Sequence, residues 1–329
     1  MKIAFTHNLK LDNREEHAEF DTPETVEFLT KTLKELGHNV LPINVTGPVT
    51  QVIYSLESFS PDLVFNTAEG ERGKFRESLY PAIFDQLKIP FTGSDAFVCA
   101  LTLDKNLTKL IVAKEGIPTP QSVLCKTVAE MDNTNLKYPL ILKPNAEGSS
   151  KGITENSIVE NKEQLTVRLS EILLNYPEGI LVEEFIQGKD VTVPYLFGAS
   201  AKTADCLEPL EYCFDQKIME SRKYNIYDYK LKNELSQYVS VKCPADISTA
   251  TKDKIIKYAK KIIEILNIKD FARMDFRVDP QENPYFIEIN ALPSLEYGAG
   301  LYESAKRIGL PEEKDVIRSI VNSAMERYN

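Results

Sequence analysis

Histidine and paired cysteine are scarce in this sequence. It contains three histidines, at positions 7, 17 and 38, and five cysteines that include no CxxC pair. Zinc sites require such residues at characteristic spacings, so the sequence argues against a zinc site. No histidine lies near a cysteine in sequence to activate it, and idle or buried thiols are therefore favoured over a cysteine nucleophile.

Long apolar runs and an excess of positive charge are also missing. No stretch approaches the roughly 18 apolar residues of a membrane span, and the start MKIAFTHNLK holds one short apolar run rather than the core of a signal peptide. We therefore expect a cytoplasmic protein with no membrane partner. Lys and Arg number 39 against 49 Asp and Glu, a net charge of −10, which disfavours an extended nucleic-acid surface. A local basic pocket remains compatible with this balance.

The composition is that of a globular protein with more than one lobe. The 329 residues are 43% hydrophobic and 27% charged, and a chain of this length usually folds into two or three compact units. In residues 1–93, strand-like runs at 2–6, 39–43 and 62–65 alternate with helical patterns at 22–36 and 77–87. This alternation predicts an α/β fold with a parallel sheet and crossover helices.

Two further lobes are predicted after this one. Residues 94–186 contain a polar helix at 103–115 and short strands near 121–124, 140–143 and 180–186. Residues 187–329 contain strands near 191–197, 271–278 and 284–290 and an amphipathic helix at 249–266. The predicted domains are therefore 1–93, 94–186 and 187–329, with clefts between them.

Residues 140–152, LILKPNAEGSSKG, place a lysine at the end of an apolar strand and then a loop rich in glycine and serine. Backbone N–H groups of such a loop can surround phosphate oxygens, and Lys143 can supply positive charge. A solvent-exposed loop beside an ordinary surface lysine is the alternative. Alone, this segment is a weak signal for phosphate binding.

Residues 181–193, LVEEFIQGKDVTV, contain two adjacent carboxylates and, after a short connecting segment, a third. The backbone near Ile186 can pair with an adenine edge, and a carboxylate such as Asp190 can accept hydrogen bonds from ribose hydroxyls. The alternative is a charged hairpin with no ligand.

A stronger polar pattern lies in the segments FARMDF, from Phe271, and YFIEIN, from Tyr285. Residues two apart on a strand share a face, so Arg273 lies with Asp275, and Glu288 with Asn290. If the two strands pair, these side chains form one patch whose oxygens suit a hard cation such as Mg²⁺. A solvated outer face of a sheet is the rival interpretation.

Six segments in order now resemble the ATP-grasp superfamily, and most closely its D-alanine–D-alanine ligase branch. They are LDKNLTK, LILKPNAEGSSKG, LVEEFIQGKDVTV, YDYKLK, ARMDF and IEINALP, and the resemblance extends from about Asp62 to Ser304. It implies a three-lobed ATP-grasp fold with an N-terminal parallel-sheet domain. It also implies an ATP-dependent, ADP-forming ligase that joins a carboxylate to an amine through an acyl phosphate.

The resemblance assigns roles to particular residues. ATP phosphates would contact Lys105 and Lys143, and the loop containing Ser149 and Ser150 would close over them. The nucleotide-binding set further comprises Glu183, Glu184 and Ile186 at adenine, Asp190 at ribose and Lys232 at the terminal phosphate. Magnesium, or manganese in its place, would bind Asp275, Glu288 and Asn290. The catalytic residues would be Arg273, which faces the oxyanion, with Lys232 and Ser150.

The chain departs from the branch at the positions that face substrate. Glu69 stands where the branch usually has a histidine, Asn233 where it has tyrosine after lysine, and Ser294 and Glu296 follow the metal motif in place of proline–glycine and a later serine. Glu69 and Glu296 add negative charge, which favours a cationic or amine-bearing substrate. Among Glu15, Glu16 and Glu19, one is expected to anchor a substrate amino group, and Glu19 is our candidate beside the alternative of a solvated charged segment.

Several functions remain in competition at this point. The leading prediction is a D-alanine–D-alanine ligase-like enzyme that joins amino acids, or an amino acid to a small metabolite, and forms a homodimer as the family does. A genuine D-alanine–D-alanine ligase is the first alternative, and another ATP-grasp activity such as a carboxylase component is a second. An ATP-binding regulatory protein is a third, but the presence of Arg273 argues against it, because a pure binder has no oxyanion to stabilise.

Overall fold

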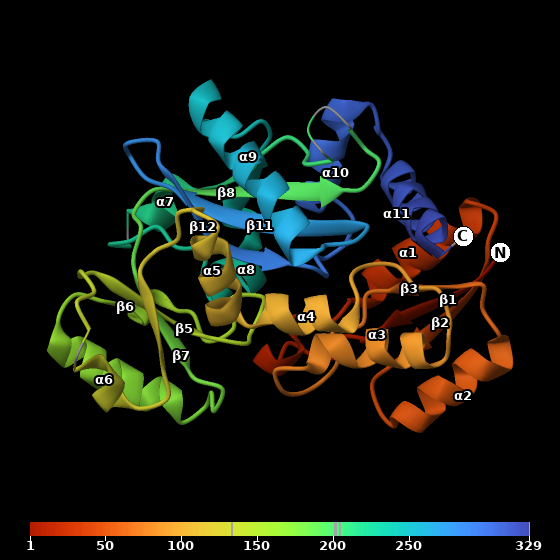
Figure 1. Cartoon of the computed structure of the whole chain (residues 1–329), viewed down its shortest axis with the longest axis horizontal. Coiled ribbons are helices and arrows are strands. Elements are labelled where there is room, and N and C mark those ends of the chain that lie inside the picture. The colour runs from red at the N-terminus through yellow and green to blue at the C-terminus, as the bar shows by residue number, and fades with distance from the viewer. Residues whose placement is uncertain (133, 201–202, 204, 221, 329) are drawn as a thin grey trace.

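The computed structural model describes residues 1–132, 134–200, 203, 205–220 and 222–328. It contains three sheets, one parallel and two antiparallel, arranged around a common centre (Figure 1). Within the described residues, no helix is both long enough and apolar enough to cross a membrane. The α/β architecture predicted from the sequence is confirmed.

The N-terminal sheet is parallel and has the strand order β2-β1-β3. Alternate residues of β1 point to opposite faces, so Ile3 and Phe5 pack with α1 while Ala4 packs with α2 and α3. Helix α1 begins where the sequence predicts, since the hydroxyl oxygen of Thr22 accepts a hydrogen bond from the N–H of Thr25 at 3.2 Å. The elements are β1 (Lys2–His7), α1 (Pro23–Glu35), β2 (Asn39–Asn44), α2 (Val49–Phe59), β3 (Leu63–Asn66) and α3 (Arg76–Gln86).

The central sheet is antiparallel, in the order β4-β7-β5-β6, and one face is covered by α6. Leu140 and Leu142 enter the core beneath α6, so Ile141 and Lys143 face the other way. This alternation turns Lys143 toward the centre of the molecule. The elements are β4 (Ser122–Cys125), β5 (Leu140–Pro144), β6 (Ile158–Val159), α6 (Lys162–Leu173) and β7 (Ile180–Glu184).

The third sheet is antiparallel, in the order β10-β9-β8-β11-β12. Ala272 and Met274 pack against α9, α4 and α5 on one face, which leaves Arg273 and Asp275 on the other. The elements are α4 (Ala96–Leu103), α5 (Lys105–Lys114), β8 (Lys189–Leu196), β9 (Leu210–Phe214), β10 (Val239–Lys242), α9 (Thr249–Leu266), β11 (Phe271–Val278) and β12 (Pro284–Asn290).

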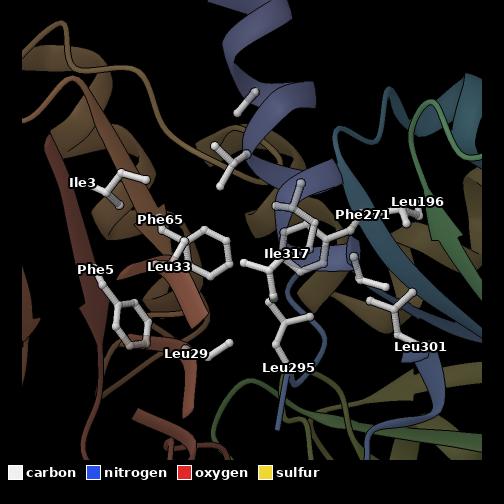
Figure 2. Close-up of a cluster of buried hydrophobic side chains, with 14 of the residues drawn as sticks. Ile3, Phe5, Leu29, Leu33, Phe65, Leu196, Phe271, Leu295, Leu301 and Ile317 are labelled. Atoms are coloured by element: carbon white, nitrogen blue, oxygen red, sulfur yellow. The ribbon is translucent and has the colours of Figure 1, made fainter. Parts of the chain in front are cut away.

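Helix α11 (Glu313–Tyr328) joins the third sheet to the first. Figure 2 shows Ile317 between Phe65 of the N-terminal sheet and Phe271 of β11, and the same core includes Leu33 of α1. One hydrophobic core thus takes residues from both the first and the last predicted domain. The limits 1–93, 94–186 and 187–329 stay a prediction. Three short helices complete the connections: α7 (Gln216–Met219), α8 (Tyr229–Asn233) and α10 (Gly300–Ala305).

Candidate active site

A cavity of about 790 Å³ lies where the three sheets meet. It is lined by the polar face of the third sheet, the inward face of the central sheet, and the loops that precede α1 and α3. All of the predicted site residues line this cavity. They are Glu19, Glu69, Lys105, Lys143, Ser149, Ser150, Glu183, Glu184, Ile186, Asp190, Lys232, Asn233, Arg273, Asp275, Glu288, Asn290, Ser294 and Glu296.

Strands β11 and β12 form the polar patch that the sequence predicts. In the antiparallel register, Arg273 lies opposite Asn290 and Asp275 lies opposite Glu288. The register shifts immediately afterwards, between Asp275 and Phe276. Such a bulge redirects the side chains next to it, and bulges are common beside active sites. Four polar groups therefore face the cavity from two neighbouring strands.

Both carboxylates of this patch are paired with cations. Arg273 donates from Nη2 to Oδ2 of Asp275 at 2.9 Å, and Thr192 donates its hydroxyl to Oδ1 at 2.7 Å. Lys105 Nζ lies 3.2 Å from Oε2 of Glu288. Burial raises the pKa of Glu288, but the positive charges of Lys105, Lys143 and Arg273 outweigh it and bring the pKa to about 2. Glu288 is therefore a carboxylate at neutral pH.

Asn290 makes a local contact as well. Its side-chain oxygen accepts a hydrogen bond from the N–H of Leu292 at 2.9 Å, which fixes the amide at the end of β12. An amide oxygen has two lone pairs, so this contact leaves one for a further partner.

Glu183 lies between two lysines at the inward face of β7. Its carboxylate is paired with Lys109 of α5 and Lys143 of β5, and all three side chains are almost fully buried. The lysines lower the pKa of Glu183 against the effect of burial, while burial lowers the pKa of Lys109 to about 8. The assignment of Glu183 to adenine stays a prediction, and its observed partners are the two ammonium groups.

Asp190, at the start of β8, has one satisfied and one unsatisfied oxygen. Arg277 donates to Oδ1 at 2.8 Å, whereas Oδ2 is buried and has no hydrogen-bond partner in the described part of the chain. A buried acceptor without a donor is costly, so a ligand hydroxyl at this position would stabilise the site. Nearby, Glu184 accepts from the N–H of Lys137 at 2.9 Å, and Ile186 lines the cavity.

The loop after β5 covers part of the cavity, and Ser149 and Ser150 contact the segment that carries α8. Ser150 donates its hydroxyl to the carbonyl of Tyr227 at 2.9 Å. Lys232 Nζ donates to the hydroxyl of Ser149 at 3.3 Å. Burial lowers the pKa of Lys232, and the neighbouring guanidinium of Arg273 adds to this effect. Asn233 hydrogen-bonds back to the carbonyl of Tyr229 at 3.1 Å.

The end of the cavity next to the N-terminal sheet is acidic. Carboxylate oxygens of Glu19, Glu69 and Glu77 lie within 4.8 Å of one another. Glu19 is neutralised by Arg76 at 2.8 Å and Lys151 at 2.6 Å, whereas burial and the adjacent glutamates raise the pKa of Glu69 and bring that of Glu77 to about 7. That Glu19 anchors a substrate amine stays a prediction, and both of its oxygens already have cationic partners.

The loop after β12 closes the same end of the cavity. Ser294 and Glu296 are exposed, and the hydroxyl of Ser294 accepts from the N–H of Glu296 at 3.2 Å. The negative charge of Glu296 contributes to the raised pKa of Asp21, which lies in the loop before α1. Asp21 accepts a hydrogen bond from the Thr67 hydroxyl at 2.5 Å.

Stability should depend on pH through Asp21. Burial, opposed by the Thr67 hydrogen bond, raises its pKa from 3.8 to about 7, so the folded state holds a proton between these values that the unfolded state has lost. The contribution of Asp21 to stability therefore falls as pH rises from 4 to 7. As pH rises over this range, we expect the free energy of unfolding of Asp21→Asn to increase relative to that of the wild type by about 1–2 kcal/mol. This is less than the full pKa shift would give, because water enters the cavity and screens the charge. Urea unfolding at pH 5 and pH 8 measures the difference, and an equal gain at both values would contradict it.

Several charged residues of the site escaped sequence reasoning. Lys109 could have been identified from its spacing, because it lies four residues after Lys105 on the same face of one helix. Arg277 could have been identified as well, since it continues the alternation of Arg273 and Asp275 along the strand. Arg76 could not be found in this way, because its partner Glu19 is distant in sequence. Lys151 pairs both with Glu19 and, at 2.5 Å, with Glu147 of its own loop, and only the second partner is near it in sequence.

Comparison with known proteins agrees with this geometry. A family model described as the D-ala D-ala ligase C-terminus matches residues 111–322. A D-alanine–D-alanine ligase of Aquifex aeolicus is 31% identical over 293 residues, covering 88% of this chain and 91% of its own length. One from Gluconobacter oxydans is 30% identical over 287 residues, covering 86% and 88%.

Solved structures match the whole fold. The D-alanine–D-alanine ligase of Bacillus anthracis in complex with ATP has a TM-score of 0.76 at 19% identity, covering 100% of this chain and 98% of its own. The VanG D-Ala:D-Ser ligase of Enterococcus faecalis has a TM-score of 0.75 at 22% identity, covering 98% and 99%. At these identities the likeness establishes the ATP-grasp fold.

Fold, cavity and family model together define an ATP-dependent ligase of the ATP-grasp class. The chain belongs to the D-alanine–D-alanine ligase family. This excludes the regulatory protein without ligase chemistry that the sequence left open.

Proposed function

We propose that this enzyme activates a carboxylate as an acyl phosphate with ATP and then transfers the acyl group to an amine. The observation that supports this best is the opposed pair Asp275 and Glu288, with Arg273 beside them, facing a cavity lined by lysines. Phosphoryl transfer depends on positioning and on neutralising charge, and this arrangement supplies both. ADP leaves in the first step, and phosphate leaves in the second as the amide bond forms.

ATP would lie between the central and third sheets. Lys105 and Lys143 would contact its phosphates, and Lys232 its terminal phosphate. Residues 184–186 lie at the end of β7 and just after it, and their backbone N–H and C=O groups would hydrogen-bond to the edge of the adenine. The unsatisfied Oδ2 of Asp190 supports a hydrogen bond from a ribose hydroxyl.

Magnesium, with manganese as the alternative, would be held by Asp275, Glu288 and Asn290. The donor set is all oxygen, and Glu288 stays ionised, as a hard divalent cation requires. When bound, the metal would neutralise charge on the phosphates. Arg273 would face the oxyanion at the reacting carbon, and the Ser149–Ser150 loop would exclude water from the acyl phosphate.

The substrates are proposed to be amino acids, or an amino acid and a small amine-bearing metabolite, with positive charge at the acidic end. Asp21, Glu69 and Glu77 all have raised pKa values, chiefly because they are buried. Repulsion from nearby carboxylates adds to this, from Glu296 at Asp21 and from Glu19 at both Glu69 and Glu77. A cationic group at this end would relieve that repulsion. The relatives are named for D-alanine, and joining two D-alanine molecules is the alternative. The homodimer expected from the family stays a prediction.

A mass-spectrometric screen tests the proposal. The protein is incubated with ATP, Mg²⁺ and pooled amino acids of both chiralities, and coupled products and free phosphate are measured. We expect phosphate release that requires a pair of substrates, and a preferred product that contains a diamino acid or another amine-bearing partner. Efficient turnover of D-alanine alone would contradict the substrate proposal, and nucleotide binding without any coupled product would contradict the ligase mechanism.

A further inference from the structure

Three charged side chains from separate segments meet beside the phosphate-covering loop. Arg76 Nη2 lies 2.8 Å from Oε1 of Glu19, and Lys151 Nζ lies 2.6 Å from Oε2. No side chain of the three is more than 9% exposed. Glu19 precedes α1, Arg76 begins α3, and Lys151 belongs to the loop after β5. We call Glu19, Arg76 and Lys151 the interdomain ion-pair cluster.

The same loop contacts the N-terminal lobe on both sides of its two serines. Arg76 donates from Nη1 to the carbonyl of Ala146 at 2.7 Å, and the N–H of Gly152 donates to Glu15 at 2.6 Å. Between these contacts, a Cβ on Gly148 would lie 2.2 Å from Oε1 of Glu19. A side chain at position 148 would therefore displace the Glu19 carboxylate.

The loop backbone requires such outside contacts. Ser149 and Ser150 have φ angles of 49° and 58°, in the left-handed region that residues with a Cβ avoid. Two consecutive residues in this region disfavour the closed loop unless interactions elsewhere compensate. Contacts with Tyr227 and Lys232 support one side of the loop, and the interdomain ion-pair cluster supports the other.

We infer that Lys151 and Arg76 are positioning residues that hold the phosphate-covering loop closed over ATP through their shared carboxylate, Glu19. The inference rests on the proposed role of the loop in covering phosphate. It also implies that Glu19 acts on the loop. Glu19 and Glu77 both pair with Arg76, whereas Glu69 has no ion pair among the described residues and is the glutamate left to meet a substrate amine.

The charge state of the cluster agrees with this role. Burial raises the pKa of Glu19, but the charges of Arg76 and Lys151 outweigh it and bring the pKa to about 2. Removing one partner from a buried ion pair leaves an uncompensated charge, which disfavours the closed state strongly. Opening would return Lys151 to water and relax the two serines.

Replacement of Lys151 tests the inference. Hydrogen exchange of the amides in residues 146–152 is compared between wild type, Lys151→Met and Lys151→Arg, with and without a non-hydrolysable ATP analogue and Mg²⁺. We expect exchange about tenfold faster or more in Lys151→Met and close to wild type in Lys151→Arg, where a tenfold change corresponds to about 1.4 kcal/mol. Lys162→Met, which removes an exposed ion pair with Asp132 at 2.9 Å, is the matched control and should leave this loop unchanged.

A second variant and a coupling measurement separate loop closure from general stability. Gly148→Ala, which forces Glu19 away from the loop, should accelerate the same exchange even if Lys151→Met folds poorly. With the substrates found by screening, Lys151→Met should release more phosphate per coupled product, because water reaches the acyl phosphate. Loop exchange within twofold of wild type in both variants overturns the inference. Exchange measured without nucleotide tests the cluster independently of the proposed acyl-phosphate mechanism.

Discussion

Replacing Arg273 by methionine is expected to lower kcat by a factor of about 10² to 10³, the usual cost of removing one donor to a developing oxyanion. The guanidinium lies 2.9 Å from Asp275 and faces the cavity from the centre of β11. Burial lowers its pKa, but Asp275 and the other neighbouring acids outweigh this, so the positive charge is permanent. Methionine keeps most of the volume and removes the charge and all donors.

The measurement is the dependence of rate on ATP and on the substrate pair identified by screening. KM for ATP should change less than kcat, because the proposed contact forms in the transition state. Arg318→Met is a matched control, since Arg318 makes a 2.8 Å ion pair with Asp315 on the surface. If Arg273→Met folds and keeps more than about a tenth of wild-type kcat, the oxyanion role is wrong.

Replacing Asp270 by alanine is expected to lower the free energy of unfolding by about 3–5 kcal/mol, the typical result of removing one partner from a buried ion pair. Asp270 is 2% exposed and accepts hydrogen bonds from the N–H of Gly93 at 2.7 Å, from Ser323 at 2.6 Å and from Arg327 at 2.8 Å. These donors come from the end of the first lobe and from α11. The substitution therefore removes contacts between segments and takes away the acceptor of the Gly93 N–H and of the Ser323 hydroxyl, while Arg327 keeps its hydrogen bonds to the carbonyls of Phe91 and Gly93.

Urea unfolding monitored by circular dichroism measures this loss. Asp279→Ala is the matched control, because Asp279 also accepts three hydrogen bonds, from Gln281 and Asn283, but all within one hairpin turn. We expect about 1 kcal/mol for the control. Equal effects of the two substitutions would show that the contacts of Asp270 between segments add no stability.

The polar patch of the third sheet could be predicted because its information is local. Alternation along two strands placed Arg273 with Asp275 and Glu288 with Asn290, and hydrogen bonding between the strands set the four side by side. Helix 249–266 was predicted to the residue for the same reason, since its apolar periodicity is local, and in the structure Ser248 caps its start.

The other half of the site could not be predicted in this way. Glu183 was assigned to the nucleotide without its partners, since Lys109 belongs to a helix whose position depends on the packing of the third sheet. Glu19 was expected to meet substrate, and only the folded structure brings Arg76 and Lys151 to it. Arg76 and Lys151 lie 57 and 132 residues from Glu19, and patterns between neighbouring residues cannot predict pairs so far apart.

The core in Figure 2 has a consequence for the order of events on the ribosome. Ile3, Phe5 and Phe65 leave the exit tunnel long before Ile317 and the rest of α11, with both other sheets synthesised in between. Until α11 emerges, the face of the N-terminal sheet that packs on α1 lacks part of its cover, and these side chains stay partly exposed. A nascent chain halted before residue 313 should therefore bind chaperones that recognise apolar surface, and release should coincide with completion of this helix.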